Sequence, residues 1–230
     1  AWSPGPFLRD GGAEDLEAQA RGPIEAVVEM NMPLPMLVDR LKGAPGYVTW
    51  FERAFPGVGI TEETIPQAIA TFERTVVSGA APFDHWVAGD DSAISEQAKR
   101  GFLLFNTEAE CVTCHFGWNF TDDQFHDIGL ETADIGRAGV AGADPEAVHA
   151  FKTPGLRNIT RRAPFMHDGS IPDLKSAIEH YVDGGVDRPS KSPLIRPLLT
   201  LDAQDVEDLV AFLETLTGAE EAMALPTLPN

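Results

Sequence analysis

Residues 111–115 of this 230-residue chain read Cys-Val-Thr-Cys-His, and this short stretch decides how the rest of the sequence is interpreted. Cys111 and Cys114 are the only two cysteines, and His115 follows the second one directly. In the CxxCH pattern, two thiols join the vinyl groups of a haem and the following histidine binds the iron. The motif therefore predicts one covalently attached haem c on this chain, with His115 as an axial ligand.

Three other interpretations of the cysteines explain the motif less well. A thioredoxin-type dithiol needs a βαβ setting, and no β-branched strand precedes Cys111. A zinc site needs two further ligands, and the remaining candidates include no second close pair: His126, His149, His167 and His180. A structural disulfide accounts for neither the tight spacing nor His115. Haem attachment is the interpretation that uses all three residues.

The composition is that of a folded and strongly acidic protein. The chain is 43% hydrophobic, and its 36 acidic and 17 basic residues give a formal charge of -19. Such a chain can bury a sizeable core, and its surface repels nucleic-acid phosphates and anionic lipids. No apolar run approaches the roughly 20 residues of a membrane span. We therefore expect neither nucleic-acid binding nor membrane insertion, and any export signal is expected to lie upstream of Ala1.

Helical periodicity between the prolines and glycines predicts a mainly α fold with long irregular loops. A helix over residues 95–105 leads almost directly into the CxxCH motif. A polar, glycine-rich loop is expected over residues 121–154, and an exposed tail over residues 219–230. Further helices are predicted over residues 13–20, 36–42, 46–54, 64–78, 173–181 and 202–216.

The strongest helical pattern follows Thr64. Thr64 and Gln67 have the spacing of a capping box, and Pro66 is tolerated in the first turn. Four residues at helical spacing then form an apolar stripe: Ile65, Ile69, Phe72 and Val76.

The second axial ligand of the iron stays open on the residues alone. The downstream candidates are Met166, His167, His180 and Tyr181. Each also has an ordinary role, because methionine packs in cores, a histidine forms hydrogen bonds, and Tyr181 ends a predicted helix before two glycines.

Ordered blocks along the chain resemble the bacterial di-haem cytochrome c peroxidases and their MauG-type relatives. The blocks are residues 68–78, 82–84, 101–105, 119–122, 125–129, 136–137, 151–154, 156–158 and 163–169. Members of this family have two haem domains, and the motif here resembles the second attachment motif. The resemblance implies a cytochrome c-like haem domain over residues 61–218, with residues 1–60 as the remainder of a first, peroxidatic haem domain. Either an upstream segment with its own motif has been cut away, or a natural variant has lost it.

The resemblance also implies roles for individual residues. Gln19 and Glu29 have the ten-residue spacing of the pair that lines the peroxide side of the first haem, where Glu29 would be the acid/base of O–O cleavage. On the second haem, Tyr181 stands where MauG has a tyrosine and the peroxidases a methionine. It is therefore the predicted sixth ligand, with Met166 as the runner-up. The haem-binding residues are then Cys111, Cys114, His115, Tyr181, His167 and Arg157.

The implied function is that of a periplasmic oxidoreductase that uses hydrogen peroxide to form high-valent iron and oxidises a partner protein. In MauG-like chemistry the side chains of the partner are oxidised during maturation, whereas in a simple peroxidase a small redox protein supplies the electrons. A monohaem electron-transfer protein is the alternative if no upstream haem domain exists. Calcium near Ala163-Pro164 and a homodimer are further expectations.

Two departures from the family pattern bear on electron transfer. Arg9 stands where a tryptophan is usual between the haems, and Ala109 stands where MauG-like enzymes carry a surface tryptophan. Trp118, three residues after His115, is the remaining aromatic candidate, either as a substitute or as a residue packed on the haem.

Overall fold

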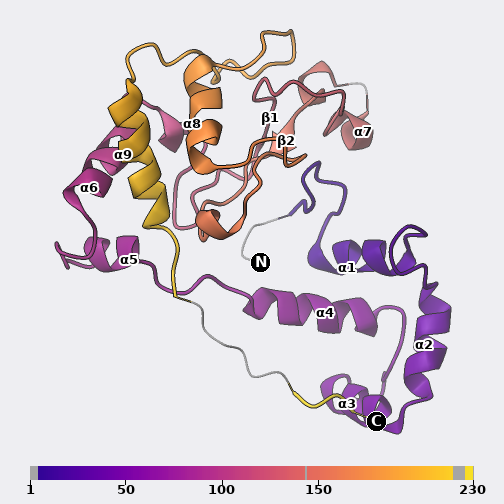
Figure 1. Ribbon diagram of the computed structural model, residues 1–230. Coiled ribbons are helices and arrows are strands. Elements are labelled where there is room, and N and C mark those ends of the chain that lie inside the picture. The colour runs from indigo at the N-terminus through magenta and orange to yellow at the C-terminus, as the bar shows by residue number, and fades with distance from the viewer. Residues whose placement is uncertain (1–4, 143, 220–225, 230) are drawn as a thin grey trace. The chain divides into compact units, whose positions relative to one another are not determined.

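The computed structural model describes residues 5–142, 144–219 and 226–229. Helices dominate this part of the chain, which confirms the mainly α prediction (Figure 1). The chain divides into two compact units. The described residues of 1–8, 12–77 and 222–230 form the first, and those of 9–11 and 78–221 form the second. In the described residues, no helix is long and apolar enough to cross a membrane.

The first unit contains α1 (Leu16–Glu25), α2 (Leu34–Lys42), α3 (Pro45–Ala54) and α4 (Thr64–Thr75). Helix α1 begins later than predicted, because the Asp15 side chain caps it by accepting a 2.7 Å hydrogen bond from the Ala18 N–H. It also continues beyond the predicted end, through Gly22 and Pro23, and buries Ile24. A bidentate ion pair between Arg74 and Glu17, with both N–O distances 2.9 Å, joins α4 to α1.

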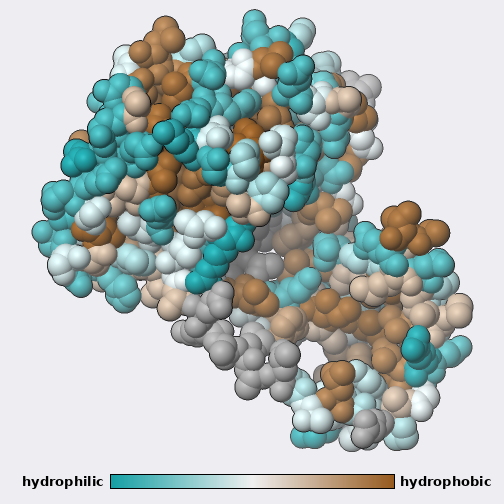
Figure 2. All heavy atoms as spheres, in the orientation of Figure 1, coloured by the Kyte–Doolittle hydropathy of each residue, from teal (hydrophilic) through white to brown (hydrophobic). Residues whose placement is uncertain are grey.

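Helix α4 differs from its sequence pattern in two ways. Thr64 lies inside the helix and its N–H donates to Thr61 Oγ1 at 3.1 Å, so the predicted Thr64–Gln67 capping box is wrong. Of the apolar stripe only Ile65 is buried, whereas Phe72 and Val76 are about half exposed. The buried face of α4 is rotated toward Thr64, Ile65, Pro66 and Ala70. Exposed apolar residues accordingly appear brown over this unit in Figure 2.

The second unit is a helical frame with a long irregular insertion. The frame consists of α5 (Pro82–Val87), α6 (Glu96–Asn106), α8 (Leu174–Asp183) and α9 (Ala203–Glu214). In its described residues, the insertion between α6 and α8 holds only short elements: α7 (Ala138–Ala141), an antiparallel pair of β1 (Phe125–His126) and β2 (Phe151–Lys152), and 3-10 turns at Cys111–Thr113, Pro145–Ala147 and Ile159–Arg161. The expectation of little secondary structure over residues 121–154 is thus confirmed.

Aromatic side chains form the core where α6 and α9 cross. Phe212 of α9 is fully buried, and its ring centroid lies 5.1 Å from that of Phe105 and 5.6 Å from that of Phe83. The crossing is close because Gly101 of α6 has no side chain, and a Cβ there would lie 1.9 Å from the Asp208 carbonyl oxygen. This core fixes the end of α6, from which the CxxCH segment departs.

The compact units do not coincide with the predicted haem domains. The sequence placed a boundary between residues 60 and 61, whereas the contacts divide the chain between 77 and 78, because α4 packs against α1. Of the predicted tail, residues 220–225 and 230 lie outside the described part of the chain, and Leu228 is 70% exposed.

Candidate haem site

The CxxCH segment forms a tight turn just after α6. Glu110 adopts a left-handed conformation with φ of 51°, and the chain then enters the 3-10 turn Cys111–Thr113. The turn is closed by a 2.9 Å hydrogen bond from the His115 N–H to the Cys111 carbonyl oxygen. Both cysteines are therefore held close to His115, and both are free thiols.

The electrostatics of the two thiols do not suit a redox dithiol. Burial raises the pKa of Cys111 to about 12 and that of Cys114 to about 11. A thioredoxin-type nucleophile needs a lowered pKa, because the thiolate is the reactive form. The structure thus supports the interpretation of these residues as attachment points for haem.

The imidazole of His115 is oriented by the backbone. Its Nδ1 lies 2.9 Å from the Phe120 carbonyl oxygen. Because a carbonyl only accepts, Nδ1 must carry the proton, and Nε2 keeps its lone pair for a metal. Burial lowers the pKa of His115, which favours this neutral form. Phe120 has a φ of 54°, so an uncommon left-handed residue aims the carbonyl at the ligand.

Tyr181, the predicted sixth ligand, lies 66 positions after His115 in the sequence. It sits in the last turn of α8. The residue as a whole is half-buried. Burial of its phenol raises the pKa of Tyr181 well above the usual range, and negative charge on Cys111 and Cys114 would raise it further. Two thiols, an imidazole and a half-buried tyrosine are groups that fit a c-type haem with His/Tyr ligation.

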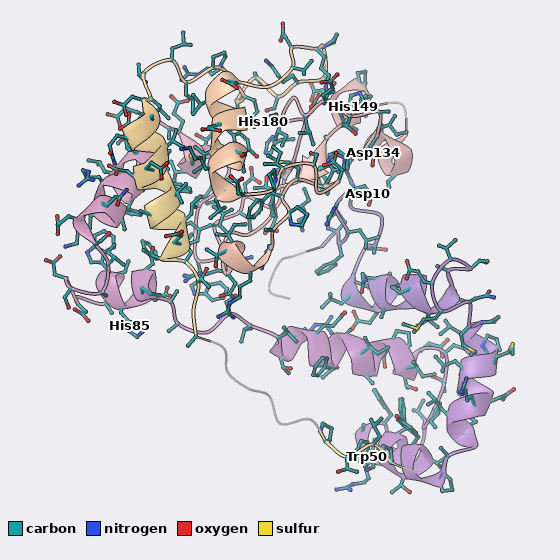
Figure 3. All side chains as sticks on the ribbon, in the orientation of Figure 1. Asp10, Trp50, His85, Asp134, His149 and His180 are labelled. Atoms are coloured by element: carbon teal, nitrogen blue, oxygen red, sulfur yellow. The ribbon has the colours of Figure 1, made fainter. Side chains whose placement is uncertain are left out.

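Hydrogen bonds on both sides of Tyr181 hold the end of α8 in place. His180, labelled in Figure 3, has its Nε2 3.0 Å from the Ile128 carbonyl oxygen. Gly184 ends the helix in a left-handed conformation, and its N–H donates to the Tyr181 carbonyl oxygen at 3.1 Å. Buried Asp127, next to Ile128, forms a bidentate pair with Arg188 at 2.7 and 2.5 Å. These contacts restrict how far Tyr181 can move.

The other candidates for the sixth ligand are placed differently. Met166 is half-buried, with a φ of 69°, within a turn closed by the Phe165–Ile171 bridge. The His167 ring stacks on Phe151 with centroids 3.7 Å apart. Tyr181 stays the predicted ligand on the family resemblance, and Met166 stays the runner-up.

Arg157 lies beside the segment that follows His115. It is 3% exposed, its Nη1 donates to Asp84 Oδ2 at 2.6 Å, and its Nε donates to the Trp118 carbonyl oxygen at 2.9 Å. Its guanidinium carbon is 5.1 Å from the centroid of the Trp118 ring, which is half exposed. Sequence reasoning missed Asp84 as the charge partner of Arg157. Haem contact by Arg157 and by His167 stays a prediction.

A further carboxylate lies close to the attachment site. Ligand atoms of Cys114, Asp122 and His126 all lie within 4.8 Å of one another, and Asp122 Oδ2 is 2.8 Å from His126 Nε2. Sequence reasoning placed Asp122 and His126 in family blocks without assigning them a role. Their spacing of four residues was the available signal.

The residues predicted for the first haem lie in the first unit. Gln19 is half-buried in α1, and Glu29 is exposed in the turn that follows this helix. The turn begins only after Glu25, because α1 continues through Gly22 as far as Glu25. Arg9 belongs to the second unit, where its carbonyl oxygen accepts a 2.8 Å hydrogen bond from the Lys152 N–H and its side chain is exposed.

Comparison with protein families gives two matches that together span nearly the whole chain. Residues 2–92 match the family described as di-haem cytochrome c peroxidase, and residues 98–217 match cytochrome c. The match of residues 2–92 to a di-haem family supports the di-haem interpretation and not the monohaem alternative.

Relatives and solved structures agree with these matches. The chain is 49% identical to the methylamine utilization protein MauG of Methylorubrum extorquens over 97% of its length and 64% of the relative. It is 46% identical to the MauG of Methylophilus methylotrophus, over 97% of this chain and 68% of that protein. The cytochrome c551 peroxidase of Pseudomonas aeruginosa is 33% identical, over 96% and 63%. The chain thus spans about two thirds of the length of these curated relatives.

Structural similarity extends over the same region. A crystal structure of a MauG-like protein associated with microbial copper homeostasis superposes with a TM-score of 0.84 and 31% identity, covering 94% of this chain and 73% of that one. The diheme peroxidase BthA from Burkholderia thailandensis gives a TM-score of 0.77 and 25% identity, over 94% and 66%. The chain therefore belongs to the di-haem cytochrome c peroxidase and MauG family.

Proposed function

We propose that the protein is a MauG-like di-haem oxidoreductase that uses hydrogen peroxide to oxidise the side chains of a partner protein. The observation that carries this proposal is Tyr181 itself, a half-buried tyrosine in the last turn of α8 whose pKa responds to charge on Cys111 and Cys114. The two relatives quoted above at 49% and 46% identity are both named MauG, which supports the MauG-like assignment.

The residues of the second unit would hold one haem and set its properties. The thiols of Cys111 and Cys114 would tether it, and His115 and Tyr181 would bind its iron. Bound haem supplies the redox-active iron. A phenolate is a hard anionic donor that stabilises oxidised iron, whereas a thioether favours ferrous iron and raises the potential. Tyr181 would therefore suit a haem that stores oxidising equivalents for a partner.

Glu29 and Gln19 would serve the peroxide side of the other haem. The carboxylate of Glu29 takes a proton from one peroxide oxygen and returns it to the leaving oxygen, and Gln19 is its hydrogen-bonding neighbour. The exposed position of Glu29 in the turn after α1 leaves its side chain accessible to such a ligand. Calcium near Ala163-Pro164 and a homodimer remain predictions.

Export to the periplasm forms part of the proposal. Covalent haem attachment needs two reduced cysteines that meet haem outside the cytosol, and in this chain Cys111 and Cys114 are the only cysteines.

A second candidate function is simple peroxide reduction with electrons from a small redox protein. The observation in its favour is the 33% identity to the cytochrome c551 peroxidase of Pseudomonas aeruginosa. In this case Met166 would bind the iron and the haem would deliver electrons.

Near-infrared spectroscopy of the ferric full-length protein separates the two candidates. We expect Tyr181→Phe to change the spectrum of one haem, and Met166→Leu to leave it as in the wild type. A His/Met charge-transfer band that survives in Tyr181→Phe and disappears in Met166→Leu would refute the MauG-like assignment and support the simple peroxidase.

A further inference from the structure

A carboxylate and an imidazole meet beside the second thiol of the attachment motif. One carboxylate oxygen of Asp122, one ring nitrogen of His126 and the Cys114 sulfur lie within 4.8 Å of one another. The Asp122 side chain is 9% exposed and the His126 side chain 17% exposed. The proposed ligand set and the proposed catalytic pair use neither Asp122 nor His126.

The backbone holds the Asp122 carboxylate in place. The Gln124 N–H donates to Asp122 Oδ1 at 2.9 Å, and His126 Nε2 lies 2.8 Å from Oδ2. His126 is the second residue of β1, where it is paired with Phe151 of β2. The neighbouring Thr121 hydroxyl donates to the Thr153 carbonyl oxygen at 2.7 Å, which joins the two ends of the loop. Asp122 is thus a fixed group and not a mobile surface carboxylate.

The carboxylate is negatively charged at neutral pH. Burial alone would raise the pKa of Asp122, but hydrogen bonds from His126, the Gln124 N–H and Thr153 outweigh burial and lower it. In the holoprotein the Cys114 sulfur belongs to a thioether, so it carries no charge of its own. Asp122 therefore places a negative charge close to this sulfur.

We propose that Asp122, held in place by His126, tunes the haem attached at Cys111 and Cys114 by lowering its reduction potential. The inference rests on the proposed haem binding and deepens it. A negative charge in a region shielded from water interacts more strongly with nearby charges than a surface charge does. It favours ferric over ferrous iron, because the ferric state carries one more positive charge. Asp122 would act in the same direction as the anionic oxygen of Tyr181.

Asp122→Asn in the full-length holoprotein tests the inference, with Asp123→Asn as the matched control. Asp123 is the adjacent carboxylate, and it pairs with Lys152 Nζ at 3.2 Å. Spectroelectrochemical titration should show one of the two haem potentials shifted upward in Asp122→Asn, with a clearly smaller shift in Asp123→Asn. Asp122→Glu should restore the wild-type value. The inference is overturned if both potentials are unchanged in Asp122→Asn, or if both asparagine variants shift equally.

Substitutions at His126 provide a test that keeps Asp122. His126→Lys places a permanent cation beside the carboxylate and should raise the same potential, whereas His126→Gln places an uncharged amide there and should leave the potential lower than in His126→Lys. Equal potentials in these two variants would contradict an electrostatic role even if Asp122→Asn does not fold. A pyridine haemochrome assay distinguishes failure of the proposed function from failure of the inference about Asp122. Absence of haem at Cys111 and Cys114 of the wild-type protein would refute the proposed function itself.

Discussion

Gly101→Ala should destabilise the second unit, although alanine is the better helix former. Gly101 lies in α6 at its crossing with α9. A Cβ at this position would lie 1.9 Å from the Asp208 carbonyl oxygen and 2.9 Å from the Phe212 Cβ. Backbone atoms form the closer contact, so a change of side-chain rotamer cannot relieve it. The two helices must move apart.

The size of the effect follows from the packing around the crossing. Restoring an ordinary contact requires a separation of roughly 1.5 Å, enough to lose much of the dispersion energy of each affected contact. Phe212 would then lose its close packing on Phe105 and Phe102, whose ring centroids lie 5.1 and 5.3 Å away. Overpacking costs about 1–3 kcal/mol, lost aromatic pairs add about 1 kcal/mol each, and alanine recovers about 1 kcal/mol of helix propensity. We expect a net loss of about 3 kcal/mol.

Urea unfolding of the holoprotein, followed by the haem absorbance and by far-ultraviolet circular dichroism, measures this loss. Gly139→Ala is the matched control, because Gly139 lies in α7 of the same unit and a Cβ there would meet only the Ile135 side chain, at 3.8 Å. The control should change the free energy of unfolding by about 1 kcal/mol or less. If Gly101→Ala is as stable as the wild type, the close α6–α9 crossing is not what holds the unit together.

Three further predictions concern the haem and its surroundings. Replacing Cys111 and Cys114 together by alanine should abolish the covalent haem stain of this attachment site on a denaturing gel, and a stain that persists at this site would exclude CxxCH attachment. Glu29→Gln in the full-length protein should slow the reaction with peroxide about 100-fold or more while the ferric spectrum stays unchanged, as stopped-flow absorbance would show, and unchanged kinetics would reduce Glu29 to a surface carboxylate. Burial would raise the pKa of Asp127, but the ion pair with Arg188 outweighs burial, and the pKa is lowered in the folded protein. The stability that ionised Asp127 contributes is therefore complete above about pH 4, and it disappears as the pH falls through the lowered pKa of the folded state. Asp127→Asn should therefore unfold at lower urea concentration at pH 7, with a weaker loss of stability on acidification, and identical acid profiles would contradict this.

The helices that the sequence predicts best are those preceded by a residue whose side chain caps the first turn. Ser95, Asp173 and Asp202 each accept a hydrogen bond from an N–H in the first turn of α6, α8 and α9, close to where the pattern places these helices. Gly22-Pro23 is a usual helix end, yet α1 continues through it, because burial of Ile24 depends on distant contacts that local sequence rules do not include.

The residues of the candidate site likewise divide into those that a local motif identifies and those that depend on distant contacts. Cys111, Cys114 and His115 lie within five residues, so the motif alone identifies them. Tyr181 lies 66 positions after His115, beyond the long loop, and only the family resemblance pointed to it. The pairing of Arg157 with Asp84 joins positions 73 apart and has no local signal.

The hydrogen bond from His115 to Phe120 is made to a backbone carbonyl, and this affects how the site can be studied. Any residue at position 120 has the same backbone carbonyl oxygen, so substitution by alanine leaves the acceptor intact. Alanine scanning therefore measures only the loss of the Phe120 ring from the core. A residue whose φ is 54° is instead sensitive to backbone preference. Glycine or asparagine at position 120 should preserve the orientation of the imidazole, whereas a β-branched residue such as valine should disturb it without removing any atom that touches the ligand.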